Sequence, residues 1–251
     1  MSISVRVYGL AAVALGVPGL VYASFAAMGL PVPPHAPGYQ ILAYAAAGLL
    51  VLAGLAVNIR RTAPAASLAL AAFFALCVLA LHVPRAFAQP TVWVSYEGVA
   101  EVMVMALGGV LAFTLVPGPG ERRAAAILRI ARSPFGLCLI VFGTSEYVYA
   151  AFTASLVPAW LPLSQLFWTY LTGAAQIAAG LAILTGVKAR LAAILLTTMY
   201  LIFGLIVHLP RVIADPSGAG RWAENGVNLV LAGAAWVLVD CLARAGMRSR
   251  R

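Results

Sequence analysis

The sequence predicts an all-α integral membrane protein with eight transmembrane helices, arranged as two parallel-related four-helix bundles. The composition, the alternation of apolar runs with basic clusters, and an internal repeat all predict it. Of the 251 residues, 63% are apolar and only 9% are charged, and the mean hydropathy is +0.99. A soluble domain has roughly a quarter of its residues charged, whereas lipid-facing helices have almost none. The lipid bilayer is therefore the expected solvent of this chain.

Eight stretches of the chain have few or no charged side chains over the length of about twenty residues that a helix needs to cross a bilayer. We predict helices over residues 7–30, 39–59, 65–83, 95–116, 134–156, 163–187, 191–209 and 222–242. The net charge of +9 lies in short clusters between these runs. Clusters of this kind indicate membrane topology and do not indicate a nucleic-acid partner.

Eight crossings place 13 of the 16 Lys and Arg residues on one side of the membrane. Only Arg85, Arg211 and Arg221 fall on the other side. Because basic residues are enriched in cytoplasmic loops, we expect a multi-pass protein of the cell inner (plasma) membrane with both termini cytoplasmic. The thirteen are Arg6, Arg60, Arg61, Arg122, Arg123, Arg129, Arg132, Lys188, Arg190, Arg244, Arg248, Arg250 and Arg251.

An offset of 126 or 127 residues relates the two halves of the chain. The segment His82-Val83-Pro84-Arg85 matches His208-Leu209-Pro210-Arg211. Other pairs keep nearly the same offset: Gly16 with Gly143, Phe25 with Phe152, Gly54 with Gly180, Glu97 with Glu224, and Glu101 with Asn228. We expect two four-helix repeats, 1–120 and 134–251, joined by a basic cytoplasmic linker, 121–133. Since each repeat crosses the membrane an even number of times, their symmetry axis should lie along the membrane normal.

Each repeat contains a helix that ends in His-x-Pro-Arg. Proline lacks an amide donor and clashes with the preceding turn, so Pro84 and Pro210 are expected where these helices end or kink. His82 and His208 lie just inside these ends. A two-fold axis would present two imidazoles from opposite sides, as the axial ligands of a haem b between the repeats. The alternatives are a hydrogen bond to a quinone carbonyl and a purely structural hydrogen bond.

The motif arginines, Arg85 and Arg211, are expected just outside these helix ends, within reach of Glu97, Glu101 or Glu224. Such pairs either clamp helices together or leave the arginines to hold an anionic or quinone-like head group. Glu97 and Glu101 are four residues apart, so they share a helix face and repel each other unless a cation or proton intervenes.

Glu146 lies alone in the fifth predicted helix, where the first repeat has Gly19. A charged carboxylate near mid-bilayer costs on the order of 3 kcal/mol, so we expect this group to be protonated, paired or exposed to a cavity. A hydrogen bond to Tyr22, Tyr147 or Tyr149 is one interpretation, and a proton-relay or ligand-binding role is the other.

The common enzyme motifs are absent from the sequence. It has no Walker loop, no Gly-x-Ser-x-Gly, no His-Glu-x-x-His and no Cys-x-x-Cys. The three isolated cysteines are expected to serve packing. The sequence therefore identifies no catalytic residue and leaves open whether the protein is an enzyme.

The four-helix unit, with a glycine in its first helix (Gly16, Gly143) and an acidic fourth helix (Glu97, Glu224), resembles the DoxX-like membrane proteins. In this chain the unit is duplicated in tandem. The resemblance implies a compact four-helix bundle that often acts beside redox enzymes; one namesake is a subunit of a thiosulfate:quinone oxidoreductase. The fusion and the His-x-Pro-Arg motifs depart from the usual pattern of the family.

Two functional hypotheses follow. The first is a redox accessory subunit that binds quinone or haem near the extracytoplasmic side, within a membrane redox complex, through the histidines, arginines and acids named above. The second is a non-enzymatic scaffold or assembly subunit of a larger complex. A small-solute transporter is a third, weaker hypothesis, because the sequence shows no interrupted helices at matching positions.

Overall fold

The structure, a computed structural model, describes residues 1–248, and it contains helices and no strand within that range. The elements in chain order are α1 (Ile3–Tyr22), η1 (Ala26–Met28), α2 (Tyr39–Val57), α3 (Ala63–Cys77), η2 (Val78–His82), α4 (Val83–Ala88), α5 (Trp93–Leu115), α6 (Glu121–Val148), α7 (Ala150–Leu156), α8 (Gln165–Thr185), α9 (Ala189–Phe203), η3 (Gly204–His208), α10 (Leu209–Ala214) and α11 (Ala219–Arg248).

Eight spans in the described chain are long and apolar enough to cross a membrane. They are α1, α2, α3 to α4, α5, α6, α8, α9 to α10, and α11, which confirms the predicted class and helix number. The fifth span has different bounds from those expected. It begins at Glu121, so the expected linker 121–133 is the first part of α6, and it ends at Val148, before the separate short helix α7. Arginines are costly in the bilayer core but compatible with a helix, so a span predicted from charge begins too late.

Pro84 and Pro210 do not end their spans, because the chain stays helical to Ala88 after the first proline and to Ala214 after the second. A π-helical turn precedes each proline. The Val83 N–H bonds to the carbonyl of Val78, and the Leu209 N–H bonds to that of Gly204, five residues back. The wider turn accommodates the proline ring, which would clash with a carbonyl in a regular α-helix. The two spans therefore carry a π-helical turn at matching positions while each remains one continuous helical span.

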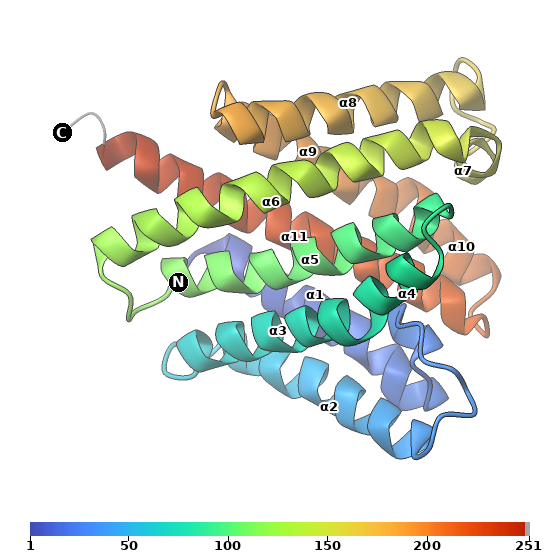
Figure 1. The fold of residues 1–251 in the computed structure, drawn as a ribbon, viewed down its shortest axis with the longest axis horizontal. Coiled ribbons are helices and arrows are strands. Elements are labelled where there is room, and N and C mark those ends of the chain that lie inside the picture. Colours follow the sequence, from blue (N-terminus) through green and yellow to red (C-terminus); the bar gives the residue numbers. More distant parts are fainter. Residues whose placement is uncertain (249–251) are drawn as a thin grey trace.

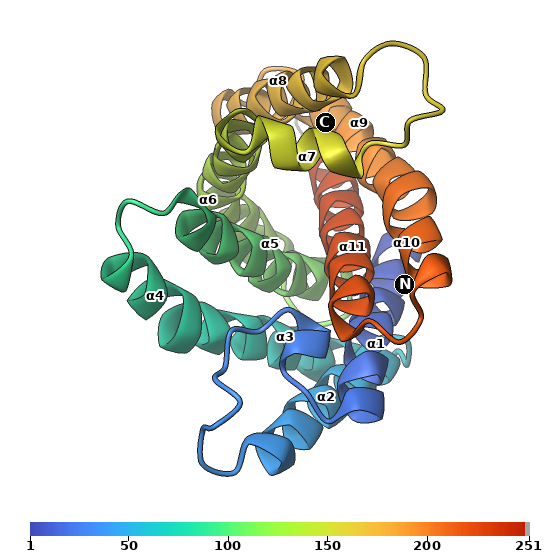
Figure 2. The ribbon, with the colours of Figure 1, turned by 90° about the vertical axis from the view of Figure 1, so that its right-hand side faces the viewer.

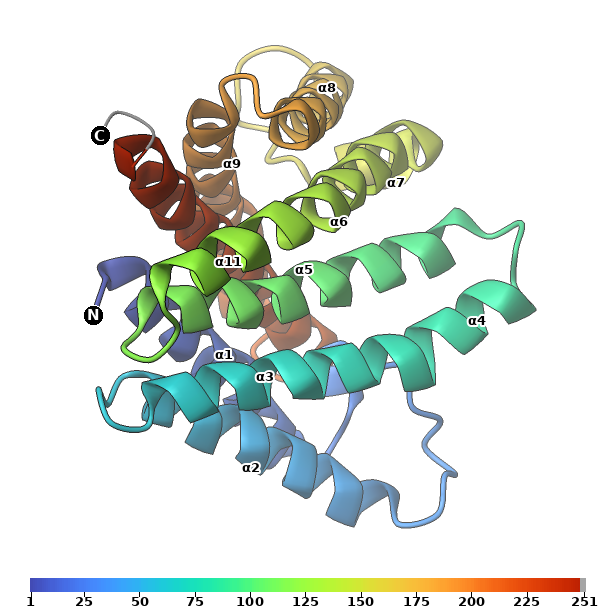
Figure 3. The same ribbon diagram turned by 60° about the vertical axis from the view of Figure 1, so that its left-hand side comes forward.

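The fourth spans of the two units, α5 and α11, lie side by side at the centre of the molecule (Figure 1, Figure 2). The first span of each unit packs mainly against its own second span and the fourth span of the other unit, α1 against α11 and α6 against α5. The helices thus form two closed rings, which share the central pair; Figure 2 shows the rings end-on, and Figure 3 shows the same helices from the side. One ring contains α1, α2, α3, α5 and α11, and the other contains α5, α6, α8, α9 and α11. The two units therefore interlock through their fourth helices.

Glycines join the first and second spans of each unit in the same way. A Cβ atom on Gly54 would lie 2.5 Å from the carbonyl oxygen of Gly9, and one on Gly180 would lie 2.6 Å from that of Gly136. Side chains at these positions would force the helices apart, so small residues permit the close backbone contact. The two units therefore resemble each other in helix packing as well as in sequence.

The basic residues predicted to share one side lie toward the end of the bundle that holds the N-terminus and the α2–α3, α5–α6 and α8–α9 connections (Figure 1). Arg250 and Arg251, which belong to this set, lie outside the described residues. Arg85, Arg211 and Arg221 lie toward the opposite end. We call this second end the outer end.

Candidate functional site

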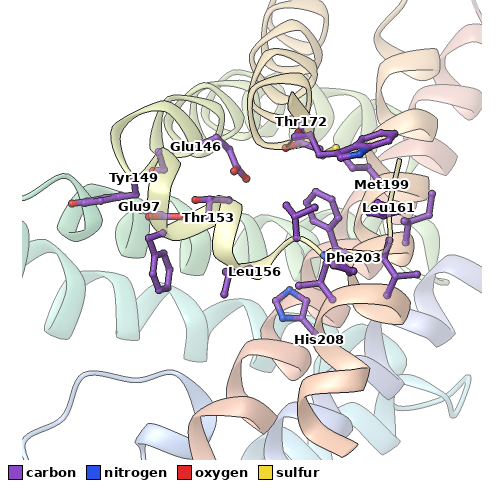
Figure 4. Close-up of a pocket in the computed structure, with 18 of the residues that line it drawn as sticks. Glu97, Glu146, Tyr149, Thr153, Leu156, Leu161, Thr172, Met199, Phe203 and His208 are labelled. Atoms are coloured by element: carbon purple, nitrogen blue, oxygen red, sulfur yellow. Dashed lines mark hydrogen bonds between the residues drawn. The ribbon is translucent and has the colours of Figure 1, made fainter. Parts of the chain in front are cut away.

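A chamber of about 1000 Å³ lies inside the ring of the second unit, toward the outer end (Figure 4). Its walls come from α5, α6, α7, α8, α9 and η3. Most lining side chains are apolar or aromatic: Val92, Val94, Phe152, Leu156, Val157, Pro158, Leu161, Trp168, Leu195, Met199, Ile202, Phe203, Ile206 and Val207. The polar lining residues are Glu97, Ser145, Glu146, Tyr149, Thr153, Thr172, Thr198 and His208. Apolar walls with a few polar groups are typical of small-molecule sites.

Two carboxyl groups reach the same side of the chamber, Glu97 from α5 and Glu146 from α6 (Figure 4). The indole N–H of Trp93 donates to the Ser145 hydroxyl at 2.9 Å. This bond ties the outer ends of α5 and α6 together beside the two acids. Glu101 follows one turn later on α5, close enough to Glu97 for their charges to interact, but it does not line the chamber.

A series of hydrogen bonds extends from Glu146 into the bundle. The Gln176 side-chain amide donates to Glu146 Oε1 at 3.3 Å, and the Tyr200 hydroxyl donates to Gln176 at 3.5 Å. Asn228 donates to the backbone carbonyl of Tyr200 at 2.9 Å. Gln176, Tyr200 and Asn228 are all buried. The carboxyl on α6 is therefore connected through buried polar groups to α8, α9 and α11.

The three tyrosines expected as partners of Glu146 bind elsewhere. The Tyr147 hydroxyl donates to the Tyr170 carbonyl at 3.0 Å, and the Tyr22 hydroxyl donates to that of Pro216 at 2.7 Å. The Tyr149 hydroxyl accepts a hydrogen bond from a backbone N–H of α5 at 3.0 Å. The sequence suggested tyrosines close to Glu146 along the chain, or in the matching helix, whereas the actual partner comes from α8.

Gln176 and Tyr200 were not among the residues predicted from the sequence, yet the repeat contains a signal for them. At the offset of 126, Gln176 corresponds to Leu50 and Tyr200 to Phe74, and both counterparts are buried apolar residues. Both residues are therefore recognisable from the repeat, because each is polar where the other repeat is apolar. Together they form the hydrogen-bond network behind Glu146.

The two motif histidines occupy different surroundings. His208 lines the chamber, and its Nδ1 atom has no hydrogen-bond partner within residues 1–248. His82 is 6% exposed and packs on α5, where a Cβ atom on Gly98 would lie 2.7 Å from its Nδ1. The helices that follow them, α4 and α10, lie on opposite sides of the molecule (Figure 2). The imidazoles do not line a common cavity, and the described chain contains no group of three or more His, Cys, Asp or Glu side chains arranged to hold a metal.

The two motif arginines also differ. Arg211 forms a 2.8 Å ion pair with Glu224, and Arg221 approaches the same carboxylate to 3.7 Å. Arg85 is exposed and forms no ion pair with Glu97 or with any other carboxylate that the structure describes. Neither motif arginine lines the chamber. The helix-clamp interpretation thus fits Arg211, while the structure places both arginines outside the cavity.

In the first ring, the corresponding space is filled by the chain itself. The segment after α1 turns inward, and Phe25 and Met28 are buried there beside α11. Gly19 holds the position of Glu146, and a Cβ atom on it would lie 2.7 Å from the Met28 sulfur. In the second unit the equivalent segment forms α7, where Phe152 is 65% exposed and lines the open chamber. The two units therefore share a scaffold, but the first has no room for a carboxyl at this position.

Comparisons with known proteins give one match. Residues 135–238 match a family model described as Domain of unknown function (DUF8561). The matched segment begins in α6 and ends in α11, so it includes Glu146, Gln176 and Tyr200. The chain matches none of the curated proteins and none of the solved structures.

Proposed function

We propose that this protein is a membrane-embedded redox accessory subunit that holds a quinone-type lipid in the chamber of the second unit. One observation carries the proposal: a large apolar chamber has polar atoms at two separate positions, Glu146 Oε2 and His208 Nδ1, that find no hydrogen-bond partner within residues 1–248. A quinone has a flat ring with polar oxygens on opposite edges and a long apolar tail. Oxygens on opposite ring edges can face the two polar positions, with His208 available to a carbonyl and Glu146 available to the hydroxyl of the reduced form. The tail suits the remaining walls.

The size and openness of the chamber support a ligand with a tail. A volume of about 1000 Å³ is at the upper end of the usual range for ligand pockets. Several lining residues are exposed, among them Leu195 and Ile202 on α9. Side chains at these positions on a membrane-spanning helix border the lipid, so a tail can pass from the chamber into the bilayer.

The placement of the histidines favours quinone over haem. Ligation of one iron by both imidazoles requires that they face the same cavity. His208 lines the chamber, whereas His82 is packed against α5 outside it. A quinone needs hydrogen bonds from one chamber only.

We also propose that the protein resides in the inner (plasma) membrane with cytoplasmic termini, which puts the chamber near the extracytoplasmic side. The basic residues toward the end that holds the N-terminus support this orientation. The resemblance of each unit to DoxX-like proteins supports a membrane redox complex as the partner.

The test is an absorption spectrum and an organic extraction of the protein purified in a mild detergent. We expect about one quinone per chain, because the chamber has room for one ring, and no Soret band. Met199→Trp fills the chamber and should remove most of the quinone. Leu191→Trp places the same side chain at an exposed site on α9 outside the chamber and should retain it.

Two outcomes would contradict the proposal. A stoichiometric Soret band without quinone would replace it with haem binding. Protein that carries no lipophilic molecule but co-purifies with a larger complex would favour the scaffold function.

Transport is a second candidate, favoured by the π-helical turns at matching positions of the two units. Proteoliposomes distinguish it from static binding. Release of a chamber-bound, fluorescent quinone analogue across the membrane would support transport, and retention on one side would exclude it for that ligand.

A further inference from the structure

The hydrogen-bond donors that line the chamber are largely used within the protein. The hydroxyls of Ser145, Thr172 and Thr198 donate to backbone carbonyls of their own helices at 3.1, 2.9 and 3.0 Å, respectively. The Trp168 indole N–H donates to the Pro162 carbonyl at 2.6 Å. Thr153, the remaining lining threonine, lies beside Glu146. The Ser145, Thr172, Thr198 and Trp168 donors are therefore not directed at a ligand. The lining groups that can donate but have no acceptor within residues 1–248 are the Tyr149 hydroxyl, which accepts the Val94 N–H, and the His208 imidazole, whose Nδ1 has no partner there.

The acceptors of the chamber are less fully used. Glu146 accepts a hydrogen bond from Gln176 on Oε1, and its Oε2 has no partner in the described chain. Glu97 brings a second carboxyl group to the same side. An ionised carboxylate can only accept hydrogen bonds and a protonated one donates a single bond, so a pair of acids that holds one proton still has more acceptors than donors. No Lys or Arg is present among the described lining residues. The chamber thus has an excess of acceptors on the side of the two acids.

From this imbalance, and resting on the proposed function, we propose that the chamber selects the reduced, dihydroxy form of its quinone. A hydroquinone O–H can donate to Glu146 Oε2 or to Glu97, and hydrogen bonds to a charged acceptor are among the stronger ones in proteins. A quinone carbonyl is itself an acceptor. It would face the carboxylate without a hydrogen bond between them, which is unfavourable for both buried groups. The protein then holds the reduced lipid for an oxidising partner.

The experiment compares two probes, a decyl-substituted benzoquinone and its hydroquinone, bound under anaerobic conditions to purified full-length protein stripped of lipid. Quenching of tryptophan fluorescence reports binding, because Trp168 lines the chamber. We expect the hydroquinone to bind at least tenfold more tightly. A tenfold preference raises the midpoint potential of the bound two-electron couple by about 30 mV, which a redox titration measures independently.

Two substitutions assign the preference to the acids. Glu146→Gln and Glu97→Gln each replace an acceptor-only group by an amide that can donate, and each should reduce the preference to less than threefold. Asp215→Asn makes the same chemical change in the exposed connection before α11 and should keep the preference of the natural protein.

The possible results separate the two proposals. Binding of neither probe would overturn both proposals. Equal binding of the two forms by the natural protein, or tighter binding of the quinone, would overturn the selectivity and leave quinone binding intact. An undiminished preference in both glutamine variants would overturn the assignment to Glu146 and Glu97.

Discussion

Glu146 marks a chemical difference between the two copies of the repeated unit, since the first copy has Gly19 at the same position. A charged carboxylate in a membrane-spanning helix costs up to about 3 kcal/mol at the helix centre, and Glu146 lies in the last turn of α6, toward the outer end. In the second unit Gln176 hydrogen-bonds the carboxyl and the chamber surrounds it, which offsets this cost. The first unit has neither, because Leu50 replaces Gln176 and Met28 fills the space beside Gly19. The two units therefore differ both at this position and in the side chains that surround it.

The first prediction exchanges these residues. Gly19→Glu should destabilise the protein by on the order of 3 kcal/mol, since the new carboxyl would be buried without a partner. Glu146→Gly removes a costly group and should leave stability close to that of the natural protein. Thermal unfolding of both variants in the same detergent measures the difference. Equal stability of Gly19→Glu and the natural protein would show that the first ring has room for an acid.

At the scale of single residues, the sequence identified the charged groups and the histidines because such residues are rare in apolar runs. It did not identify Gln176 and Tyr200, since uncharged polar residues are less costly in a membrane helix and are less conspicuous. Repeat symmetry also suggested that Arg85 would pair as Arg211 does. The pair does not form because Glu97 lines the chamber of the other unit, beside Glu146.

At the scale of elements, the number of spans could be predicted from apolar length, whereas their local geometry could not. Both prolines were recognised, but a proline allows either a helix end or a continuation through a wider turn. The choice depends on packing: η2 lies against α5, and η3 lies against α11. Those contacts are absent from a local sequence pattern.

The second prediction concerns these π-helical turns. Pro210→Ala restores an amide donor and allows a regular α-helical register, which would rotate Val207 and His208 relative to the chamber that they line. We expect quinone binding to weaken about tenfold, the loss of one well-placed polar contact. The matched control is Pro84→Ala, because η2 does not line the chamber, and its binding should stay within twofold. Equal losses in both variants would indicate general destabilisation.

At the scale of the whole molecule, the repeat predicted two similar units but not how they interlock. An apolar face shows that a helix is buried on that side, but it does not identify the neighbouring helix. The contacts of α1 with α11 and of α6 with α5 connect the units, and they depend on the shapes of all five helices in a ring. This arrangement places Glu97 of α5, which belongs to the first unit, in the chamber of the second.

The third prediction is the orientation of the whole chain. Ser217→Cys lies in the connection before α11 at the outer end, and Arg61→Cys lies between α2 and α3 at the opposite end. A membrane-impermeant maleimide should label the first variant in intact cells and the second only after lysis. The natural cysteines, Cys77, Cys138 and Cys241, are buried and should give little background. The reverse labelling pattern would invert the proposed topology.

The central position of α11 has a consequence for biogenesis. This helix has the largest buried share of the eight described spans and closes both rings, yet the ribosome makes it after the other seven. At about 5–20 residues per second, α1 would wait roughly 10 to 40 s in the membrane for its partner. Insertion and packing are therefore separate events in this protein, and a truncation that removes only the final helix leaves every earlier span in place with neither ring complete. We expect such an inserted but unassembled chain to accumulate less than the natural protein, because the helices that pack on α11 would lack their partner.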